Sequence, residues 1–131
     1  MKSIREDVHS LIFDRYSVEP EYPWSDSPDA CVFRHNDNKK WFAIAMSVKP
    51  TSLGIDGDKP VDVMNVKIIP EDIYDLLRIE GLLPAYHMNK KHWITIMLDG
   101  TVGLKVITKL LDTSYELTRK KLSKRKIAKE E

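Results

Sequence analysis

The feature that most constrains the fold of this chain is a short polar turn between two stretches of strand-forming residues. The stretches run from Ala30 to Arg34 and from Lys40 to Val48, and the turn from His35 to Lys39 contains two Asn and one Asp. A turn this short brings the two stretches side by side as antiparallel strands. Large apolar residues occupy every second position of the second strand, so they are predicted to share one face of the sheet. These residues are Phe42, Ile44, Met46 and Val48.

A third strand is predicted from Val61 to Ile68, after a loop rich in Pro, Gly and Asp from Pro50 to Pro60. Its alternating pattern predicts that apolar side chains point to the core and polar ones point away from it. The inward residues are Met64, Val66 and Ile68, and the outward ones are Asn65 and Lys67.

A second hairpin is predicted in and after the stretch PAYHMNKKHW, residues 84–93. Its parts are an extended piece from Ala85 to Met88, a basic turn from Asn89 to Lys91, and a strand from His92 to Leu98. A two-residue turn at Asn89 and Lys90 would place His87 and His92 opposite each other across the hairpin.

Helical spacing of apolar residues predicts a first helix from Ile4 to Tyr16, begun by a capping box formed by Ser3 and Glu6. The next thirteen residues, VEPEYPWSDSPDA, contain three prolines and have no regular period. They are typical of a loop that crosses the domain, and Trp24 is predicted to attach this loop to the core.

Two more helices are predicted further along the chain. One begins at Pro70 and ends at Gly81, with Ile73, Leu76 and Leu77 on its buried side. The other runs from about Gly103 to Lys121 or beyond. Its predicted core-facing residues are Leu104, Ile107, Leu111, Tyr115 and Leu122, flanked by Val106, Leu110 and Leu117.

The order of these elements predicts an α+β domain with an antiparallel sheet covered by helices on one face. The 131 residues, 42% of them hydrophobic, are enough for one core, so we expect a single domain over residues 1–122 and a basic C-terminal tail over residues 123–131. No apolar stretch approaches the ~20 residues that span a bilayer, so we expect a cytoplasmic protein without a membrane partner. The single cysteine, Cys31, excludes an internal disulfide and a Cys-based zinc site, and its apolar neighbours predict that it is buried.

Positive charge is concentrated at the C-terminal end. Residues 119–131 contain seven Lys and Arg against two Glu, which leaves 14 Lys and Arg against 18 Asp and Glu in the first 118 residues. Such an end can attract phosphates, but it can equally complement a helix dipole and keep the protein soluble.

Several phrases of the sequence resemble one family. The MmcQ/YjbR family has phrases similar to four in this chain. They are Tyr22-Pro23-Trp24, Lys40-Trp41-Phe42-Ala43, Asn65-Val66-Lys67 before Pro70, and PAYHMNKKHW before a strand and Ser114-Tyr115-Glu116-Leu117. The resemblance covers nearly the whole chain. It implies a CyaY-like (frataxin-like) α+β fold and a proposed role in DNA binding through a double wing.

Carried onto this chain, the resemblance implies that the two hairpins are the wings. Lys39 and Lys40 lie at one predicted tip, and Asn89, Lys90 and Lys91 at the other. Lysines at such tips can reach phosphate oxygens. Lysines at turns are also commonly solvated or protect sheet edges, which is the simpler interpretation of each one alone. Both tips repeat Asn-Lys-Lys, and chance explains so short a repeat well.

The other side chains of PAYHMNKKHW allow the same two interpretations. His87 and His92 can hydrogen-bond a phosphate or a base edge, as can Asn89, and Tyr86 and Trp93 can stack on unpaired bases. Aromatic residues of this kind are also common in cores and in cross-strand packing.

Catalytic and metal-binding functions have less support. No signature of a nucleophile surrounds Ser114 or Cys31, so we expect a protein that is not an enzyme. The spacing of His87 and His92 matches no standard zinc site, and no Gly-rich phosphate loop is present, so no metal or cofactor is expected.

Two hypotheses follow from the sequence. The first is a DNA-binding module that uses two basic hairpin tips. The second is a protein-interaction or small-ligand domain in which PAYHMNKKHW shapes a pocket or stabilises the fold. Near-neutral charge favours the second, family resemblance favours the first, and in either case we expect a monomer.

Overall fold

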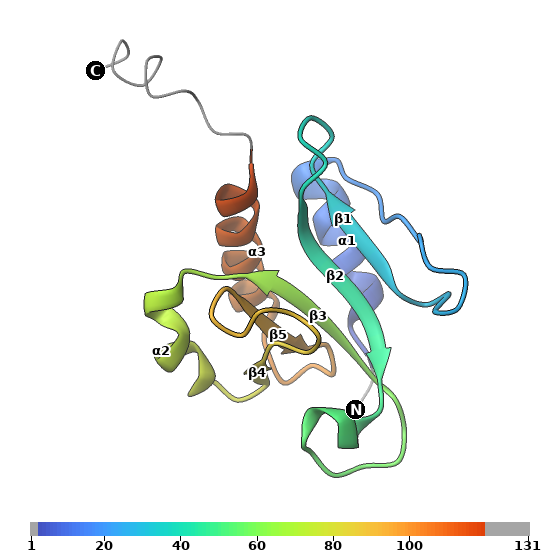
Figure 1. Ribbon diagram of the computed structural model, residues 1–131, viewed down its shortest axis with the longest axis vertical. Coiled ribbons are helices and arrows are strands. Elements are labelled where there is room, and N and C mark those ends of the chain that lie inside the picture. The colour runs from blue at the N-terminus through green and yellow to red at the C-terminus, as the bar shows by residue number, and fades with distance from the viewer. Residues whose placement is uncertain (1–2, 120–131) are drawn as a thin grey trace.

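A computed structural model describes residues 3–119 of the chain (Figure 1). Most of the predicted elements are present, but the helix predicted from Pro70 to Gly81 is much shorter and no strand covers Ala85 to Met88. A 3-10 turn, Pro50–Leu53, follows β2. A second 3-10 turn, Pro70–Asp72, leads directly into α2. The helices are α1 (Arg5–Tyr16), α2 (Ile73–Leu77) and α3 (Leu104–Thr118), and the strands are β1 (Cys31–Arg34), β2 (Trp41–Val48), β3 (Val61–Lys67), β4 (Leu82–Pro84) and β5 (Trp93–Met97).

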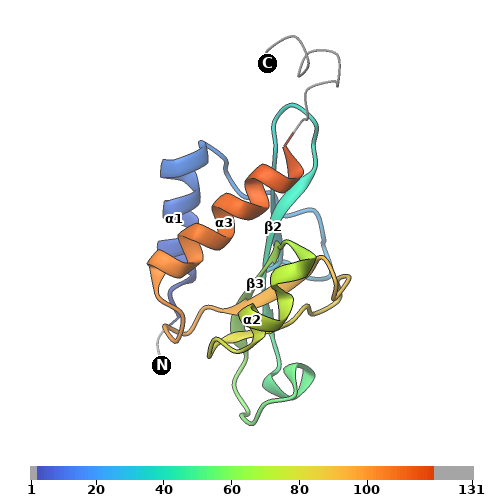
Figure 2. The ribbon, with the colours of Figure 1, turned by 90° about the vertical axis from the view of Figure 1, so that its left-hand side faces the viewer.

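The five strands form one antiparallel sheet in the order β1-β2-β3-β5-β4. Helices α1 and α3 cover one face of this sheet, and Figure 2 shows the loop before β1 and the loop between β4 and β5 on the opposite side. The short α2 lies beside the edge strand β4. The predicted α+β class, with an antiparallel sheet and its main helices on one face, is therefore confirmed. The opposite side of the sheet is hereafter called the outer face.

The hydrophobic core lies between the sheet and the two long helices. Helix α1 contributes Val8 and Ile12, and α3 contributes Ile107, Leu110 and Leu111. The sheet contributes alternate residues of its central strands, which include the predicted inward residues of β3, and the sole cysteine is also fully buried here. The core residues of the sheet and its flanks include Cys31, Phe33, Phe42, Ala43, Ala45, Met64, Val66, Ile68, Ile94 and Ile96.

A β-bulge changes which residues of β2 face the core. Phe33 pairs with Ala43, but the next residue, Arg34, pairs with Trp41, so Phe42 is an extra residue in its strand. Phe42 therefore joins Ala43 in the core. C-terminal to the bulge, residues of β2 that were predicted to face the core, Ile44 and Met46, face outward instead, and their neighbours Ala43 and Ala45 face the core. The prediction that Phe42, Ile44 and Met46 share one face is wrong, because Ile44 and Met46 lie on the outer face.

The start of α1 also differs from the prediction. Ile4 occupies the N-cap position, and no side chain caps the helix. The predicted capping box fails because the Ser3 hydroxyl donates to Asp62 Oδ2 at 2.6 Å and accepts from the backbone N–H of Arg5 at 3.1 Å. Ser3 thus ties the helix start to β3.

Two predicted core positions are exposed. Leu77, at the end of α2, is 36% exposed, and Leu104, at the start of α3, is 44% exposed. Both lie in terminal turns of their helices, where the sheet no longer covers every side of the helix. Ile73 and Leu76 do pack against the core. The predicted helix beyond Arg119, with Leu122, and the predicted tail over residues 123–131 lie outside the described residues.

The C-terminal end of α3 is joined to the β1–β2 turn by His35, which is 4% exposed. Its Nε2 lies 2.8 Å from the Thr118 hydroxyl oxygen. The Thr118 hydroxyl donates its one proton to the carbonyl of Ser114 at 2.8 Å, so it accepts the bond from His35. The His35 ring packs on Phe42 and Tyr115, with centroids 5.3 and 4.3 Å away. A neutral His35 with its proton on Nε2 satisfies this site.

Asp112 of α3 joins this helix to α1. Arg15 donates two hydrogen bonds of 2.7 Å to this carboxylate, and Tyr16 donates a third of 2.5 Å. These donors hold the pKa of Asp112 below its usual range. The Tyr16 ring stacks on Tyr115 with centroids 4.5 Å apart. The half-buried Tyr16 therefore links the helices through its ring and its hydroxyl.

We predict that Tyr16→Phe lowers the free energy of unfolding by about 1 kcal/mol, because it removes one hydrogen bond to a carboxylate and keeps the stacked ring. Urea denaturation followed by circular dichroism measures this change. The matched control is Tyr74→Phe, since Tyr74 is 83% exposed, and it should leave the midpoint unchanged. Equal midpoints for both variants and the wild type would contradict the prediction.

We also predict that stability falls as the pH drops below about 6.5, in part because of His35. Burial lowers the pKa of His35 from its ordinary value of 6.5, against the opposing effects of Asp37 and Glu116. The unfolded chain therefore takes up a proton at this position before the folded chain does, and this stability is lost as the pH falls.

The test compares urea unfolding of the wild type and His35→Gln at about pH 7.5 and 5.5. His9 has a pKa lowered by burial too and contributes equally to both proteins. The variant should lose less stability on acidification than the wild type. Equal losses would show that His35 is not a source of the pH dependence.

Candidate functional site

The β1–β2 turn holds its two lysines outward. The Asn38 side chain accepts a hydrogen bond from the backbone of Lys40 at 2.8 Å and donates one to the carbonyl of Thr118 at 2.9 Å. Lys39 has a left-handed backbone conformation, with φ of 64°. Asn38 therefore fixes the turn against α3, and both Lys39 and Lys40 are exposed.

The second hairpin differs from its prediction. Strand β4 consists of Leu82–Pro84 and pairs with β5, so residues 85–92 form the loop between them and not a paired strand. His87 and His92 consequently do not face each other across a hairpin. The predicted strand from His92 begins one residue later, at Trp93.

This loop is fixed to the outer face of the sheet by two buried polar residues. Asn65 donates to the Tyr86 carbonyl at 2.9 Å, and its oxygen accepts from the Thr95 hydroxyl at 2.5 Å. The Thr95 oxygen in turn accepts from the backbone N–H of Tyr86 at 2.8 Å. Asn65 points outward as predicted, but it is 0% exposed because the loop covers it. Buried polar groups must be paired, so this network determines where the loop lies.

The basic part of the loop is used in local hydrogen bonds. Asn89 accepts from the backbone N–H of Lys91 at 2.8 Å, the same hydrogen bond that Asn38 forms with Lys40. Lys90 donates from Nζ to the carbonyl of Ala85 at 2.8 Å. Lys90 thus bonds to its own loop, although both Lys90 and Lys91 are exposed. The repeated Asn-Lys-Lys therefore forms the same Asn-to-backbone hydrogen bond twice, with a left-handed residue only at Lys39.

The remaining predicted residues of the loop lie on both sides of it. The exposed His87 has a φ of 59° and packs against the half-buried Tyr86, with ring centroids 3.9 Å apart. The exposed His92 accepts a backbone bond from Ile68 at 2.8 Å. Trp93 is half-buried and pairs with Lys67 across β5 and β3.

Three lysines and two tryptophans surround a hollow of about 370 Å³ near the C-terminal end of α3, which we call the basic hollow. It contains Lys39, Lys40 and Trp93 of the predicted site, and no acidic residue lines it. Within residues 3–119, none of its lysines takes part in an ion pair. Its lining residues are Lys39, Lys40, Trp41, Lys67, Trp93 and Thr118.

A second hollow of about 330 Å³ lies on the outer face between the loop before β1 and the loop after β4, and we call it the aromatic hollow. Trp24 and Trp41 meet there edge to face, with ring centroids 5.8 Å apart. Trp24 therefore attaches its loop to the outer face and not to the core as predicted. The lining residues are Trp24, Asp26, Ser27, Ala30, Trp41, Ile44, Met46, Asn65, Tyr86, His87 and Met88.

Sequence reasoning missed Trp41 and Lys67 as site residues. Trp41 is 36% exposed and lines both hollows. Its position beside the first Asn-Lys-Lys repeat, matching Trp93 beside the second, was the available signal. Lys67 was predicted to point outward, but only the pairing of β3 with β5 places it beside Trp93.

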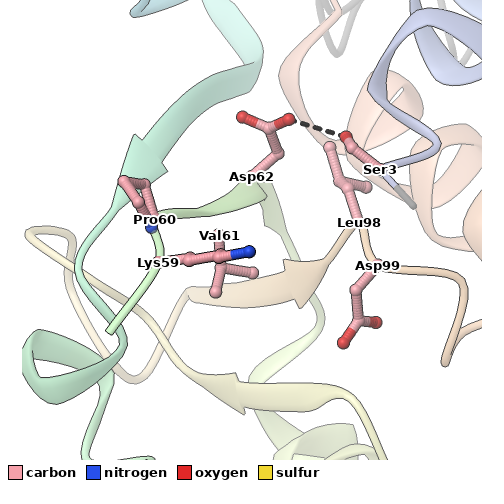
Figure 3. A pocket seen from close by; sticks show the side chains of 7 residues that line it. All are labelled: Ser3, Lys59, Pro60, Val61, Asp62, Leu98 and Asp99. Carbon is pink, nitrogen blue, oxygen red and sulfur yellow. Dashed lines mark hydrogen bonds between the residues drawn. The ribbon is translucent and has the colours of Figure 1, made fainter. Parts of the chain in front are cut away.

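A third hollow, of about 270 Å³, lies at the other end of β3 and contains none of the predicted site residues (Figure 3). Lys59 lies there with two carboxylates, those of Asp62 and Asp99. Asp62 is already bonded to Ser3, as the dashed line in Figure 3 shows. The mixed charges of this hollow select no ligand class.

Over residues 3–119 there is no group of three or more His, Cys, Asp and Glu side chains that could hold a metal ion. No helix in the same range is long and apolar enough to cross a membrane.

Comparison with known proteins gives consistent matches. A family model described as YjbR matches residues 14–117. The uncharacterized protein YyaQ of Bacillus subtilis is 42% identical over 116 residues, covering 88% of this chain and 98% of YyaQ.

Solved structures agree with the sequence matches. A crystal structure of a protein from Pseudomonas syringae is 44% identical, with a TM-score of 0.86 over 91% of this chain and 100% of that one. The crystal structure of protein DR2400 of Deinococcus radiodurans is 26% identical, with a TM-score of 0.68 over 97% of this chain and 87% of that one. The residues 14–117 that match the family model include both hairpins, the whole lining of the aromatic hollow and all of the basic hollow except Thr118, and the chain belongs to the YjbR family.

Proposed function

We propose that this protein is a non-enzymatic DNA-binding module and that the basic hollow is its contact surface. The observation that carries the proposal is the convergence of Lys39, Lys40 and Lys67 around one hollow without a carboxylate. Two of these lysines come from the first hairpin and the third from β3, so separate parts of the chain supply one positive surface.

The chemistry of the basic hollow suits a nucleic-acid backbone. Lysine ammonium groups neutralise phosphates and release condensed counterions, which makes binding sensitive to salt. The indoles of Trp41 and Trp93 add flat apolar surface next to the lysines. The basic sequence of residues 119–131 follows Thr118, which itself lines the hollow.

The proposal differs from a symmetric double wing. Lys90 at the second tip donates one hydrogen bond to the Ala85 carbonyl, which holds its ammonium group against its own loop although the residue is exposed and two N–H donors remain. The second hairpin contributes mainly through Trp93, the first residue of β5, which pairs with Lys67 where the loop joins the sheet. The first tip and the sheet next to it therefore form the larger part of the proposed surface.

We predict that a labelled DNA oligonucleotide binds with affinity that falls steeply with salt. Lys39→Ala/Lys40→Ala should reduce the slope of log K against log salt by about 1.5, since each phosphate contact contributes about 0.7 to 0.9. Fluorescence anisotropy at several salt concentrations measures both quantities.

The matched control is Lys105→Ala/Lys109→Ala, which removes two exposed charges from α3. It should change the slope little. A Lys90→Ala/Lys91→Ala variant separates the two geometries, because a symmetric double wing requires it to weaken binding as much as Lys39→Ala/Lys40→Ala does. Absence of binding to any DNA at low salt would refute the proposal and leave a protein or small-ligand partner as the function to be tested.

A further inference from the structure

We infer that the aromatic hollow receives an unpaired nucleobase carrying an exocyclic amino group, from a single strand whose phosphates lie on the basic hollow. This inference rests on the proposed function and extends it to the type of nucleic acid. It concerns the outer face, next to the surface that holds the lysines.

The two hollows adjoin at Trp41, which lines both of them. A nucleotide has its phosphate and its base at opposite ends, so a ligand held by both hollows needs charge at one end and a flat ring at the other. Lys39 and Lys40 supply the charge, and Trp41 and Trp24 supply aromatic walls. Stacking on aromatic side chains is the common way to bind unpaired bases.

The interior of the aromatic hollow suits a base better than it suits a phosphate. Met46 and Met88 add soft apolar surface, and sulfur packs favourably against aromatic rings. The only carboxylate in the lining is Asp26, which would repel a phosphate. The volume of about 330 Å³ is at the small end of ligand sites, which suits one ring system.

Asp26 gives the hollow a preference among bases. A carboxylate accepts hydrogen bonds, and cytosine and adenine present an amino group, whereas thymine and uracil present a carbonyl oxygen at the corresponding position. Asn65 also lines the hollow, but its amide is bonded to Tyr86 and Thr95. The selective contact is therefore assigned to Asp26.

The walls of the hollow are held in place by the protein itself. The hydrogen bonds of Asn65 and Thr95 fix the backbone of Tyr86, and the edge-to-face contact fixes Trp24 against Trp41. A preformed site loses little entropy when it binds. Weak binding of a free nucleoside should thus be detectable.

The first experiment titrates uncharged nucleosides and follows the indole N–H signals of the three tryptophans by ¹⁵N–¹H NMR. Cytidine should shift the signals of Trp24 and Trp41 more than that of Trp93, and should bind at least about threefold tighter than thymidine or uridine. Asp26→Asn should remove this preference, and Asp75→Asn, an exposed carboxylate of α2, should keep it. Cytidine and deoxycytidine are compared to distinguish RNA from DNA as the source.

Nucleosides carry no phosphate, so this experiment tests the aromatic hollow independently of the lysines. Indole signals that do not move with any nucleoside, or that move equally with all of them, would overturn the inference. The proposed function would still stand if oligonucleotides bind with the expected salt dependence. Nucleoside shifts at Trp24 and Trp41 without oligonucleotide binding would support the hollow as a base site and refute the DNA-binding function.

The second experiment compares a single strand rich in cytosine with one rich in thymine and with a duplex. The cytosine-rich strand should bind tightest, and Trp41→Ala should reduce its affinity towards that of the duplex. Tyr74→Ala, on the exposed side of α2, is the control. Equal affinities for all three nucleic acids would overturn the inference and leave the basic hollow as the whole contact surface.

Discussion

The arrangement of the outer face depends on one extra residue in β2. Without the bulge at Phe42, the alternation of the strand would place Trp41 on the core side with Ala43 and put Phe42 outside. The bulge instead lets Phe42 fill the core, where it contacts Tyr16 and Tyr115. Trp41 is thereby released to the outer face. The core and the candidate site therefore share one cause, because the same residue that completes the packing frees the indole that lines both hollows.

A second constraint is the pair of buried polar side chains under the loop between β4 and β5. Asn65 and Thr95 face each other across β3 and β5 and meet the backbone of Tyr86. Apolar residues at these positions would not specify where an irregular loop should lie, whereas an unpaired amide would be costly to bury. By holding the loop in place, the polar pair makes the loop a side wall on the outer face of the sheet, and a binding site requires such a concave surface.

The sequence was sufficient for the fold class and for most of the elements, because the turn of His35 to Lys39 and the helical spacing of α1 and α3 are local signals. The sequence did not predict the bulge. One extra residue in β2 leaves the spacing of apolar residues unchanged, but it moves Ile44 from the core face to the outer face. The pairing of β4 was also missed, because the three residues of this strand have too little pattern to identify. Lys67 belongs to the candidate site only because it pairs with Trp93, and a pairing between distant parts of the chain leaves no local signal in the sequence.

The two Asn-Lys-Lys repeats show why a local motif did not by itself define the site. In both, the Asn side chain accepts from the backbone N–H two residues later. At the first repeat the Asn side chain is also bonded to α3. This bond fixes the turn against the helix, and its two lysines line the basic hollow. At the second, the ammonium group of the exposed Lys90 donates to the Ala85 carbonyl of its own loop. The same Asn bond thus has different consequences, because the backbone differs, with Lys39 left-handed and Lys90 not, and because the surrounding acceptors decide what each lysine contacts.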